Sequence, residues 1–122
     1  MVKVLIVDDE PLVCEALGEV FQLAGHEVLL ASNGVEALKV VNSVCVDVAI
    51  IDIVMPEKDG LQTIEELKEI LPELKIIAIS GGSRISNVDF LDIAKQLGSA
   101  RSFYKPIDNH VIIKSVDDIL KS

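Results

Sequence analysis

Side chains able to bind a metal ion or a phosphate group stand at the ends of short apolar runs that are far apart in the sequence. They are three carboxylates, a hydroxyl and an ammonium: Asp8, Asp9, Asp52, Ser80 and Lys105. The carboxyl ends of parallel strands meet at one edge of a sheet, and ligands bind beyond that edge. If the apolar runs are parallel strands, we therefore expect these side chains to gather in one site.

Electrostatics predict a cation in that site. Two ionised carboxylates about 5 Å apart repel each other by about 3 kcal/mol at an effective dielectric constant of about 20. Lys105 would supply one positive charge, and a divalent metal ion would supply the rest. The donors are hard oxygen atoms with no His or Cys nearby in the sequence, which favours Mg²⁺ or Mn²⁺ over zinc. Because Mg²⁺ keeps bound waters and binds phosphoryl oxygens, the residues favour phosphoryl transfer to a carboxylate.

Continuous apolar runs predict strands that are covered on both faces. They are residues 4–7, 28–31, 48–51 and 76–79, and a weaker run at 102–104 predicts an edge strand. The segments between the runs carry apolar residues at helical spacing. Pro and Gly residues mark their ends, as Pro11 and Gly25 do for the first. Strand and helix therefore alternate five times, which predicts an α/β fold with a parallel sheet, right-handed crossovers and helices on both faces.

Composition limits the classes of function. The chain has 122 residues, half of them apolar, and a formal net charge of −9. This predicts one folded domain over residues 1–122. The acidic balance disfavours direct binding of nucleic acid or of an anionic membrane surface. No apolar stretch approaches the ~20 residues that span a bilayer. The first strand begins too early for a signal peptide, so a cytoplasmic location is expected.

The cysteine and histidine residues are not expected to take part in the site. Cys14 and Cys45 stand among apolar residues, which predicts two buried, reduced thiols and not a disulfide or a zinc site. His26 and His110 are expected to be solvated groups at the surface, and no role is assigned to them.

Five separated markers, taken together, make the chain resemble a response-regulator receiver domain, the CheY-like phosphoaccepting module of two-component signalling. The markers are Asp8-Asp9, Asp52, Met55-Pro56 with Asp59-Gly60, Ser80 and Lys105-Pro106. They occur in the expected order and at the expected strand ends, and the resemblance covers the chain from Val4 to Leu120. It implies a doubly wound, flavodoxin-like fold with five parallel strands in the order 2-1-3-4-5.

The resemblance also implies roles at the reacting centre. Asp52 would accept a phosphoryl group from a phosphohistidine of a histidine kinase or phosphotransfer protein, giving an acyl phosphate. Mg²⁺, or alternatively Mn²⁺, would be bound by Asp9 directly, by Asp8 mainly through water, by Asp52, and by the backbone carbonyl of Val54. Lys105 would contact a phosphoryl oxygen and pair with Asp52. These roles fit phosphoryl transfer, in which catalysis consists of positioning and charge neutralisation.

The same resemblance implies how a signal leaves the domain. Ser80 would hydrogen-bond the phosphoryl group and carry the following loop with it. This movement would switch the face formed by the fourth helix, the fifth strand and the fifth helix. The domain would not be an enzyme acting on other substrates, because it would catalyse only its own phosphorylation and dephosphorylation. A downstream effector protein or output domain would read its state.

The chain departs from the family pattern at one switch position. Receivers often carry an aromatic residue three positions before the conserved Lys, and Ser102 stands there. Alternation along the strand places Tyr104 on the same side as Ser102 and Phe103 on the other side. The sequence leaves open whether Tyr104 replaces the missing aromatic residue.

Three other functions are compatible with such a fold. A flavodoxin-like FMN carrier needs a phosphate-binding loop after the first strand, where Asp8-Asp9-Glu10 would repel phosphate. A phosphatase with an aspartate nucleophile needs an acid two residues after that nucleophile, where Val54 stands. A pseudo-receiver, which binds partners without being phosphorylated, would be expected to have lost an acidic or Lys marker, and none is lost. A binding module of the flavodoxin fold or a pseudo-receiver is the alternative to a phosphoacceptor.

Overall fold

Strands and helices alternate along the whole described part of the chain. The structure is a computed structural model, and it describes residues 2–53, 60–81, 90–105 and 107–121. The strands are β1 (Lys3–Val7), β2 (Glu27–Ala31), β3 (Val48–Asp52), β4 (Lys75–Ser80) and β5 (Arg101–Tyr104). The helices are α1 (Pro11–Leu23), α2 (Gly34–Ser43), α3 (Gly60–Ile70), α4 (Phe90–Leu97) and α5 (Asn109–Lys121). The predicted α/β alternation is confirmed.

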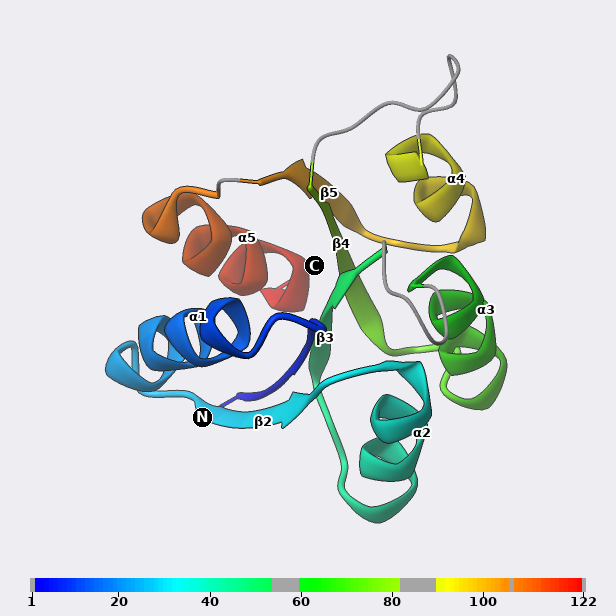
Figure 1. Ribbon diagram of the computed structural model, residues 1–122, viewed down its shortest axis with the longest axis horizontal. Coiled ribbons are helices and arrows are strands. Elements are labelled where there is room, and N and C mark those ends of the chain that lie inside the picture. Colours follow the sequence, from blue (N-terminus) through cyan, green and yellow to red (C-terminus); the bar gives the residue numbers. More distant parts are fainter. Residues whose placement is uncertain (1, 54–59, 82–89, 106, 122) are drawn as a thin grey trace.

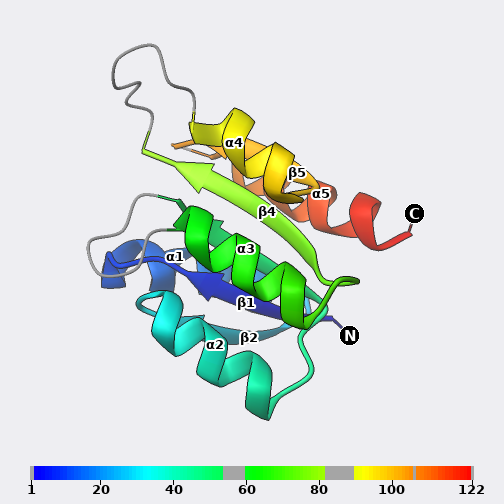
Figure 2. The same ribbon diagram turned by 90° about the vertical axis from the view of Figure 1, so that its right-hand side faces the viewer.

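The strands form one parallel sheet in the order β2-β1-β3-β4-β5, which confirms the expected strand order. β1 pairs with β2 on one side and with β3 on the other, and β4 joins β3 to β5. Because all the pairings are parallel, the strands end at the same end of the molecule, and the N-terminus lies at the opposite end (Figure 2).

Helices cover both faces of the sheet, as Figure 1 shows: α1 and α5 lie on one face, and α2, α3 and α4 lie on the other. Alternate residues of each central strand therefore enter different cores. In β1, Val4 and Ile6 pack in the core beneath α1 and α5, whereas Leu5 and Val7 pack in the core beneath the other three helices. None of the described helices is long and apolar enough to cross a membrane.

Glycines end two of the helices in the way that the sequence predicts. Gly25 follows α1 with φ of 93°, and Gly98 follows α4 with φ of 118°. Residues with a Cβ atom rarely adopt such left-handed angles, so these positions turn the chain sharply toward the next strand. The lengths of α1 and α4, and hence the places where β2 and β5 begin, depend on these turns.

β2 is an edge strand, in agreement with the expected strand order, but it is less buried than its apolar run predicts. Its apolar run 28–31 was expected to be covered on both faces, but within the described sheet β2 pairs with β1 alone, and Leu30 is 45% exposed. The expected burial is wrong because the helices cover this edge strand less completely than the central strands, so that Ala31 alone is buried in β2. The expected edge position of β5 is confirmed, since β5 pairs only with β4 in the same sheet.

Two further expectations about single residues need correction. Cys14 is buried and reduced as expected, but Cys45 is exposed, because it lies in the connection between α2 and β3 and not in a strand or helix. His110 is exposed, whereas His26 is only partly exposed and packs near Phe21, with ring centroids 6.0 Å apart.

Candidate functional site

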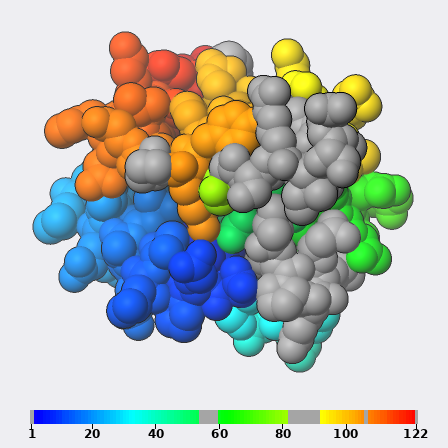
Figure 3. All heavy atoms as spheres, turned by 45° about the horizontal axis from the view of Figure 1, so that its top comes forward, coloured from blue at the N-terminus to red at the C-terminus, as the bar shows by residue number. Residues whose placement is uncertain are grey.

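The sheet brings the chemically active residues to one end of the molecule. Asp8 follows β1, Asp52 ends β3, Ser80 ends β4, and Lys105 follows β5. Backbone hydrogen bonds hold the chain just beyond the strands: the Asp8 N–H donates to the carbonyl oxygen of Ala31 at 3.1 Å, and the Lys105 N–H donates to that of Ser80 at 2.7 Å. Figure 3 looks onto this end, where the blue chain after β1 lies against the orange chain after β5.

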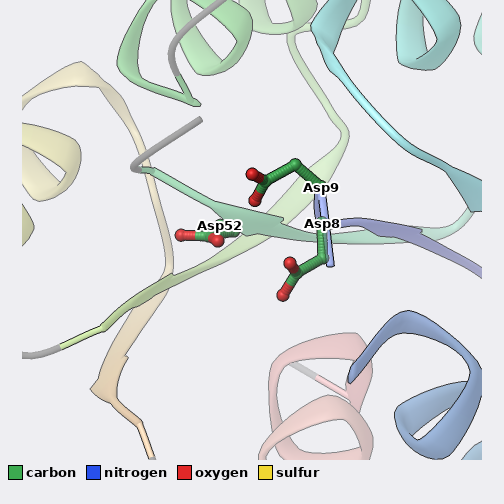
Figure 4. A group of neighbouring side chains, drawn as sticks. All are labelled: Asp8, Asp9 and Asp52. Carbon is green, nitrogen blue, oxygen red and sulfur yellow. The ribbon is translucent and has the colours of Figure 1, made fainter. Parts of the chain in front are cut away.

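Three carboxylates form a tight cluster there. Asp8, Asp9 and Asp52 each place one oxygen within 4.8 Å of the other two (Figure 4). Asp8 is 1% exposed and Asp52 is 4% exposed, whereas Asp9 is open to solvent at least in part. Burial of ionised carboxylates is unfavourable unless hydrogen bonds or opposite charges compensate it. The cluster therefore requires positive charge.

Lys105 supplies part of that charge. Its Nζ lies 2.9 Å from Oδ2 of Asp8, 3.3 Å from Oδ2 of Asp52 and 3.7 Å from Oε1 of Glu10. Burial by itself would lower the pKa of Lys105, but the hydrogen bond to Asp8 and the charge of Asp52 outweigh burial and raise it. The sequence analysis expected the pair with Asp52. It missed Asp8 as the closer partner and Glu10 as a third neighbour, although three consecutive acids after a strand were a visible signal.

The two adjacent aspartates of the cluster differ in how their oxygens are used. Oδ1 of Asp8 accepts a hydrogen bond from the Glu10 N–H at 2.9 Å, and Oδ2 accepts one from Lys105. Among the described residues, Asp9 makes no hydrogen bond or ion pair of this kind. Its carboxylate is therefore the more available of the two for a metal ion.

The donor set suits a hard divalent cation. Three carboxylates face the single ammonium of Lys105, so two negative charges stay uncompensated within the cluster. Oxygen donors of this kind are the ligands that Mg²⁺ and Mn²⁺ prefer. The nearest thiol does not compete: Cys14 lies beneath Asp8, and burial, together with the charge of Asp8, raises its pKa so that it stays protonated. Among the described residues the cluster fits Mg²⁺ and does not fit zinc.

Ser80 and the fifth strand lie beside the cluster. Ser80 is buried and stands opposite Tyr104 in the pairing of β4 with β5. Phe103 packs in the core beneath α1 and α5, while the Ser102 hydroxyl lies 3.4 Å from that of Ser99, just after α4. The alternation predicted for residues 102–104 thus agrees with the structure. Tyr104, 40% exposed, is the aromatic residue next to the strand end that carries Ser80.

Some candidate residues lie outside the described part of the chain. They are Val54, whose carbonyl was expected to bind the metal ion, and the marker residues Met55, Pro56, Asp59 and Pro106. The roles expected for them stay predictions. Gly60, the second residue of the Asp59-Gly60 marker, is described and is the first residue of α3.

An apolar groove runs beside the site between α1 and α5. It has a volume of about 570 Å³, and its lining includes Leu12, Leu17, Lys105, Ile107 and Asn109. Leu12 is 80% exposed at the start of α1, although it belongs to the apolar stripe of that helix. An apolar groove bordered by polar residues is a feature of protein-binding surfaces.

The sequence is similar to a known domain family and to several bacterial regulatory proteins. A family model described as the response regulator receiver domain matches residues 4–117. The transcriptional regulatory protein GlrR of Escherichia coli is 32% identical over 117 residues, which are 96% of this chain but 26% of GlrR. The sporulation initiation phosphotransferase F of Bacillus subtilis is 31% identical over 106 residues, which are 87% of this chain and 83% of that protein. The chain thus spans about a quarter of the length of GlrR.

Solved structures share the whole fold. The response regulator protein TrrA from Thermotoga maritima, in complex with Mg(2+)-BeF, is 31% identical with a TM-score of 0.85 and covers 98% of this chain and 99% of its own. A response regulator receiver domain protein from Clostridium thermocellum is 26% identical with a TM-score of 0.91, covering 99% and 95% of the two chains.

Proposed function

This chain belongs to the response regulator receiver domain family, and we propose that it accepts a phosphoryl group on Asp52 as part of a two-component system. The observation that carries the proposal is the buried Asp52 carboxylate, which lies in a cluster with Asp8 and Asp9 and 3.3 Å from the ammonium of Lys105. The donor is a phosphohistidine of a histidine kinase or of a histidine phosphotransfer protein.

In this reaction Asp52 is the nucleophile. One carboxylate oxygen of Asp52 forms a bond to phosphorus while the phosphorus–nitrogen bond of the donor breaks. The electron pair of that bond leaves with the imidazole, so the donor histidine is released and an acyl phosphate remains on Asp52. Lys105 keeps its positive charge at neutral pH, because its pKa is raised. Its ammonium can therefore neutralise charge on the transferred group without a proton transfer.

Metal binding is part of the same proposal. A divalent cation bound at the cluster, Mg²⁺ or alternatively Mn²⁺, would neutralise the phosphoryl oxygens. Asp9 and Asp52 would be the direct carboxylate ligands, and the backbone carbonyl of Val54 would be a third protein ligand. Asp8 acts mainly through water, which agrees with the hydrogen bonds that both its oxygens already accept.

Ser80 connects the reaction to the surface. Its hydroxyl donates a hydrogen bond to the phosphoryl group on Asp52, and its movement changes the face formed by α4, β5 and α5. The position of Ser80 at the end of β4, next to Asp52 at the end of β3, supports this role. A partner that prefers one of the two states of this face would read the phosphorylation, because a change of population needs differential binding.

The partners are proteins and not nucleic acid or membrane. A net charge of −9 repels phosphate backbones and anionic lipid. The apolar groove at Leu12 and Ile107 lies beside Lys105 and offers a surface on which a phosphodonor protein can dock. The downstream partner is an effector protein or an output domain. This choice is supported by GlrR, whose sequence is about four times as long as the matched part.

We also propose that the whole chain functions as a single domain. Residues 1–122 act as one phosphoaccepting domain in the cytoplasm, and the domain catalyses only its own phosphorylation and dephosphorylation. The match of the family model to residues 4–117 supports the extent of this domain.

Labelling by acetyl phosphate tests the proposal. The wild-type chain should become labelled in the presence of Mg²⁺ and not in the presence of EDTA, and Asp52→Asn should abolish the labelling. Asp92→Asn, the same change on the exposed surface of α4, is the control and should be labelled normally. Full labelling of Asp52→Asn would contradict the assignment. No labelling of the wild-type chain by any phosphodonor would favour a binding module that works without phosphorylation.

A further inference from the structure

Gly60 lies against the backbone of the proposed phosphoacceptor. A Cβ atom on Gly60 would be 2.3 Å from the carbonyl oxygen of Asp52, 2.3 Å from Cα of Ile53 and 2.9 Å from the carbonyl carbon of Asp52. Carbon atoms in contact are normally about 3.5–4.0 Å apart. Any other residue at position 60 would therefore have to move α3 and the end of β3 apart by about 1 Å.

Glycine is required there by the contact and not by the backbone angles. Gly60 is the first residue of α3, and alanine readily adopts a helical conformation. A substitution at Gly60 would thus act through the pressure of its side chain on Asp52 and Ile53. It would not act through strain in its own backbone.

Neither β3 nor α3 can move away from this contact without losing hydrogen bonds or buried packing. β3 is hydrogen-bonded to both β1 and β4, and the Ile53 N–H donates to the carbonyl oxygen of Ile79 at 2.9 Å. The Gly60 N–H in turn donates to the carbonyl oxygen of Ile53 at 3.2 Å. On the other side, α3 is anchored in the core by side chains that are fully buried, among them Leu67.

The contact between Gly60 and β3 lies at the residue whose carboxylate must stay close to those of Asp8 and Asp9, namely Asp52. The oxygens of Asp8, Asp9 and Asp52 lie within 4.8 Å of one another, and Mg²⁺ accepts only a narrow range of ligand geometry. We propose that Gly60 is a positioning residue of this site: the absence of its side chain lets α3 close onto the end of β3 and hold Asp52 in register with Asp8 and Asp9. The role in phosphorylation rests on the function proposed above, whereas the role in metal binding does not.

Gly60→Ala tests this role with Mg²⁺ alone and with acetyl phosphate. We expect Mg²⁺ affinity, measured by calorimetry, to fall roughly 10- to 100-fold, as it does when the supporting residues of a metal site are lost. A displacement of about 1 Å should slow labelling of Asp52 on the order of 100-fold. If Gly60→Ala does not fold in buffer alone, both measurements are made in trimethylamine N-oxide, which favours the folded state.

Two control variants separate positioning from general stability. Gly18→Ala places a methyl group in a buried helix position where the nearest atoms are side-chain carbons at an ordinary 3.4 Å. Leu67→Ala loosens α3 itself about two turns beyond Gly60. Both should keep Mg²⁺ affinity within about twofold of wild type, even where denaturation shows a loss of stability as large as that of Gly60→Ala.

Two results would overturn the proposal. One is a folded Gly60→Ala chain that binds Mg²⁺ as tightly as wild type. The other is a loss of Mg²⁺ affinity in Leu67→Ala equal to that in Gly60→Ala, which would show a general effect of loosening the helix. If the wild-type chain binds Mg²⁺ but is never labelled, the proposed function fails while the Mg²⁺ measurements still decide the role of Gly60.

Discussion

Among the single residues of the site, Lys105 touches the largest number of acidic groups. It is the cation between two buried carboxylates, those of Asp8 and Asp52, and it also approaches the exposed carboxylate of Glu10. A buried carboxylate that loses its partner bears the full penalty of desolvation. Lys105 and a bound metal ion should therefore substitute for each other in part as the source of positive charge.

Lys105→Met tests this relation. In EDTA we expect its free energy of unfolding to be lower than that of wild type by about 1–3 kcal/mol, because Asp8 and Asp52 lose their cation. Mg²⁺ should then stabilise the variant more than it stabilises wild type, since a ligand bound only by the folded state stabilises it according to its affinity. Urea denaturation with EDTA and with millimolar Mg²⁺ measures both quantities.

Lys3→Met is the matched control for loss of a lysine charge. Lys3 pairs with Glu27 at 3.7 Å on the surface, and both side chains are about half exposed, at 41% and 53%. Such exposed pairs contribute about 0–1 kcal/mol, and this one is remote from the cluster. A Mg²⁺ response of Lys105→Met that is weaker than that of wild type would contradict the proposed sharing of charge.

At the scale of elements, the start of α2 shows how local hydrogen bonds set a helix boundary. The side chain of Asn33 accepts a hydrogen bond from the Glu36 N–H at 2.9 Å. Oε1 of Glu36 in turn accepts bonds from the N–H and the hydroxyl of Ser32, each at 2.7 Å. These bonds to Ser32 lower the pKa of Glu36, because they stabilise the ionised carboxylate.

The lowered pKa predicts a dependence of stability on pH. The pKa of Glu36 is lower in the folded than in the unfolded chain, where it is about 4.3. Its contribution to stability is therefore complete above the unfolded pKa and is lost as the pH falls through the folded pKa. We expect Glu36→Gln to be less stable than wild type near neutral pH and the difference to shrink toward zero at more acidic pH, as measured by denaturation at a series of pH values.

Glu65→Gln, the same change on the exposed surface of α3, controls for the loss of one negative charge. A difference between wild type and Glu36→Gln that stays constant across the acidic range would show that the hydrogen bonds to Ser32 do not depend on the charge of Glu36. In that case protonated Glu36 would support the start of α2 as well as ionised Glu36 does.

At the scale of the whole molecule, the site lies at the carboxyl ends of the strands, between the helices that cover the two faces of the sheet. Asp8 leads into α1 on one side, whereas Ser80 ends the strand that pairs with β5 beside α4 (Figure 1). A change at Asp52 can therefore reach either face. Because Ser80 and Tyr104 are opposite each other on β4 and β5, we expect the change to spread toward α4, β5 and α5.

Tyr104 provides a direct measurement of that path, since the chain has one Tyr and no Trp. Addition of Mg²⁺ with beryllium fluoride, as a mimic of the phosphoryl group, should change the tyrosine fluorescence. It should also change the amide resonances of Phe90–Leu97 and Arg101–Tyr104. The changes should be absent in Asp52→Asn and reduced in Ser80→Ala. Resonance changes confined to α1, with Tyr104 silent, would contradict this path.

Local features of the sequence were sufficient to predict the elements and the gathering of Asp8, Asp9, Asp52 and Lys105 at one end of the sheet. Apolar runs and helix-ending residues such as Gly25 act over a few residues, so their effect can be predicted without knowledge of distant parts. A residue such as Asp52 directly after a buried run must stand at a strand end. Parallel strands that end together then place it near Asp8 and Lys105.

The tertiary structure alone decided properties that depend on which distant segments become neighbours. Leu30 of β2 and Cys45 are exposed, although both stand in apolar segments of the sequence. Lys105 lies closer to Asp8 than to Asp52, and Gly60 touches the backbone of Asp52. Burial and contact distances of this kind are set by packing between elements. They cannot be read from hydrophobicity or residue type, because the same local sequence has different neighbours at the edge and at the centre of a sheet.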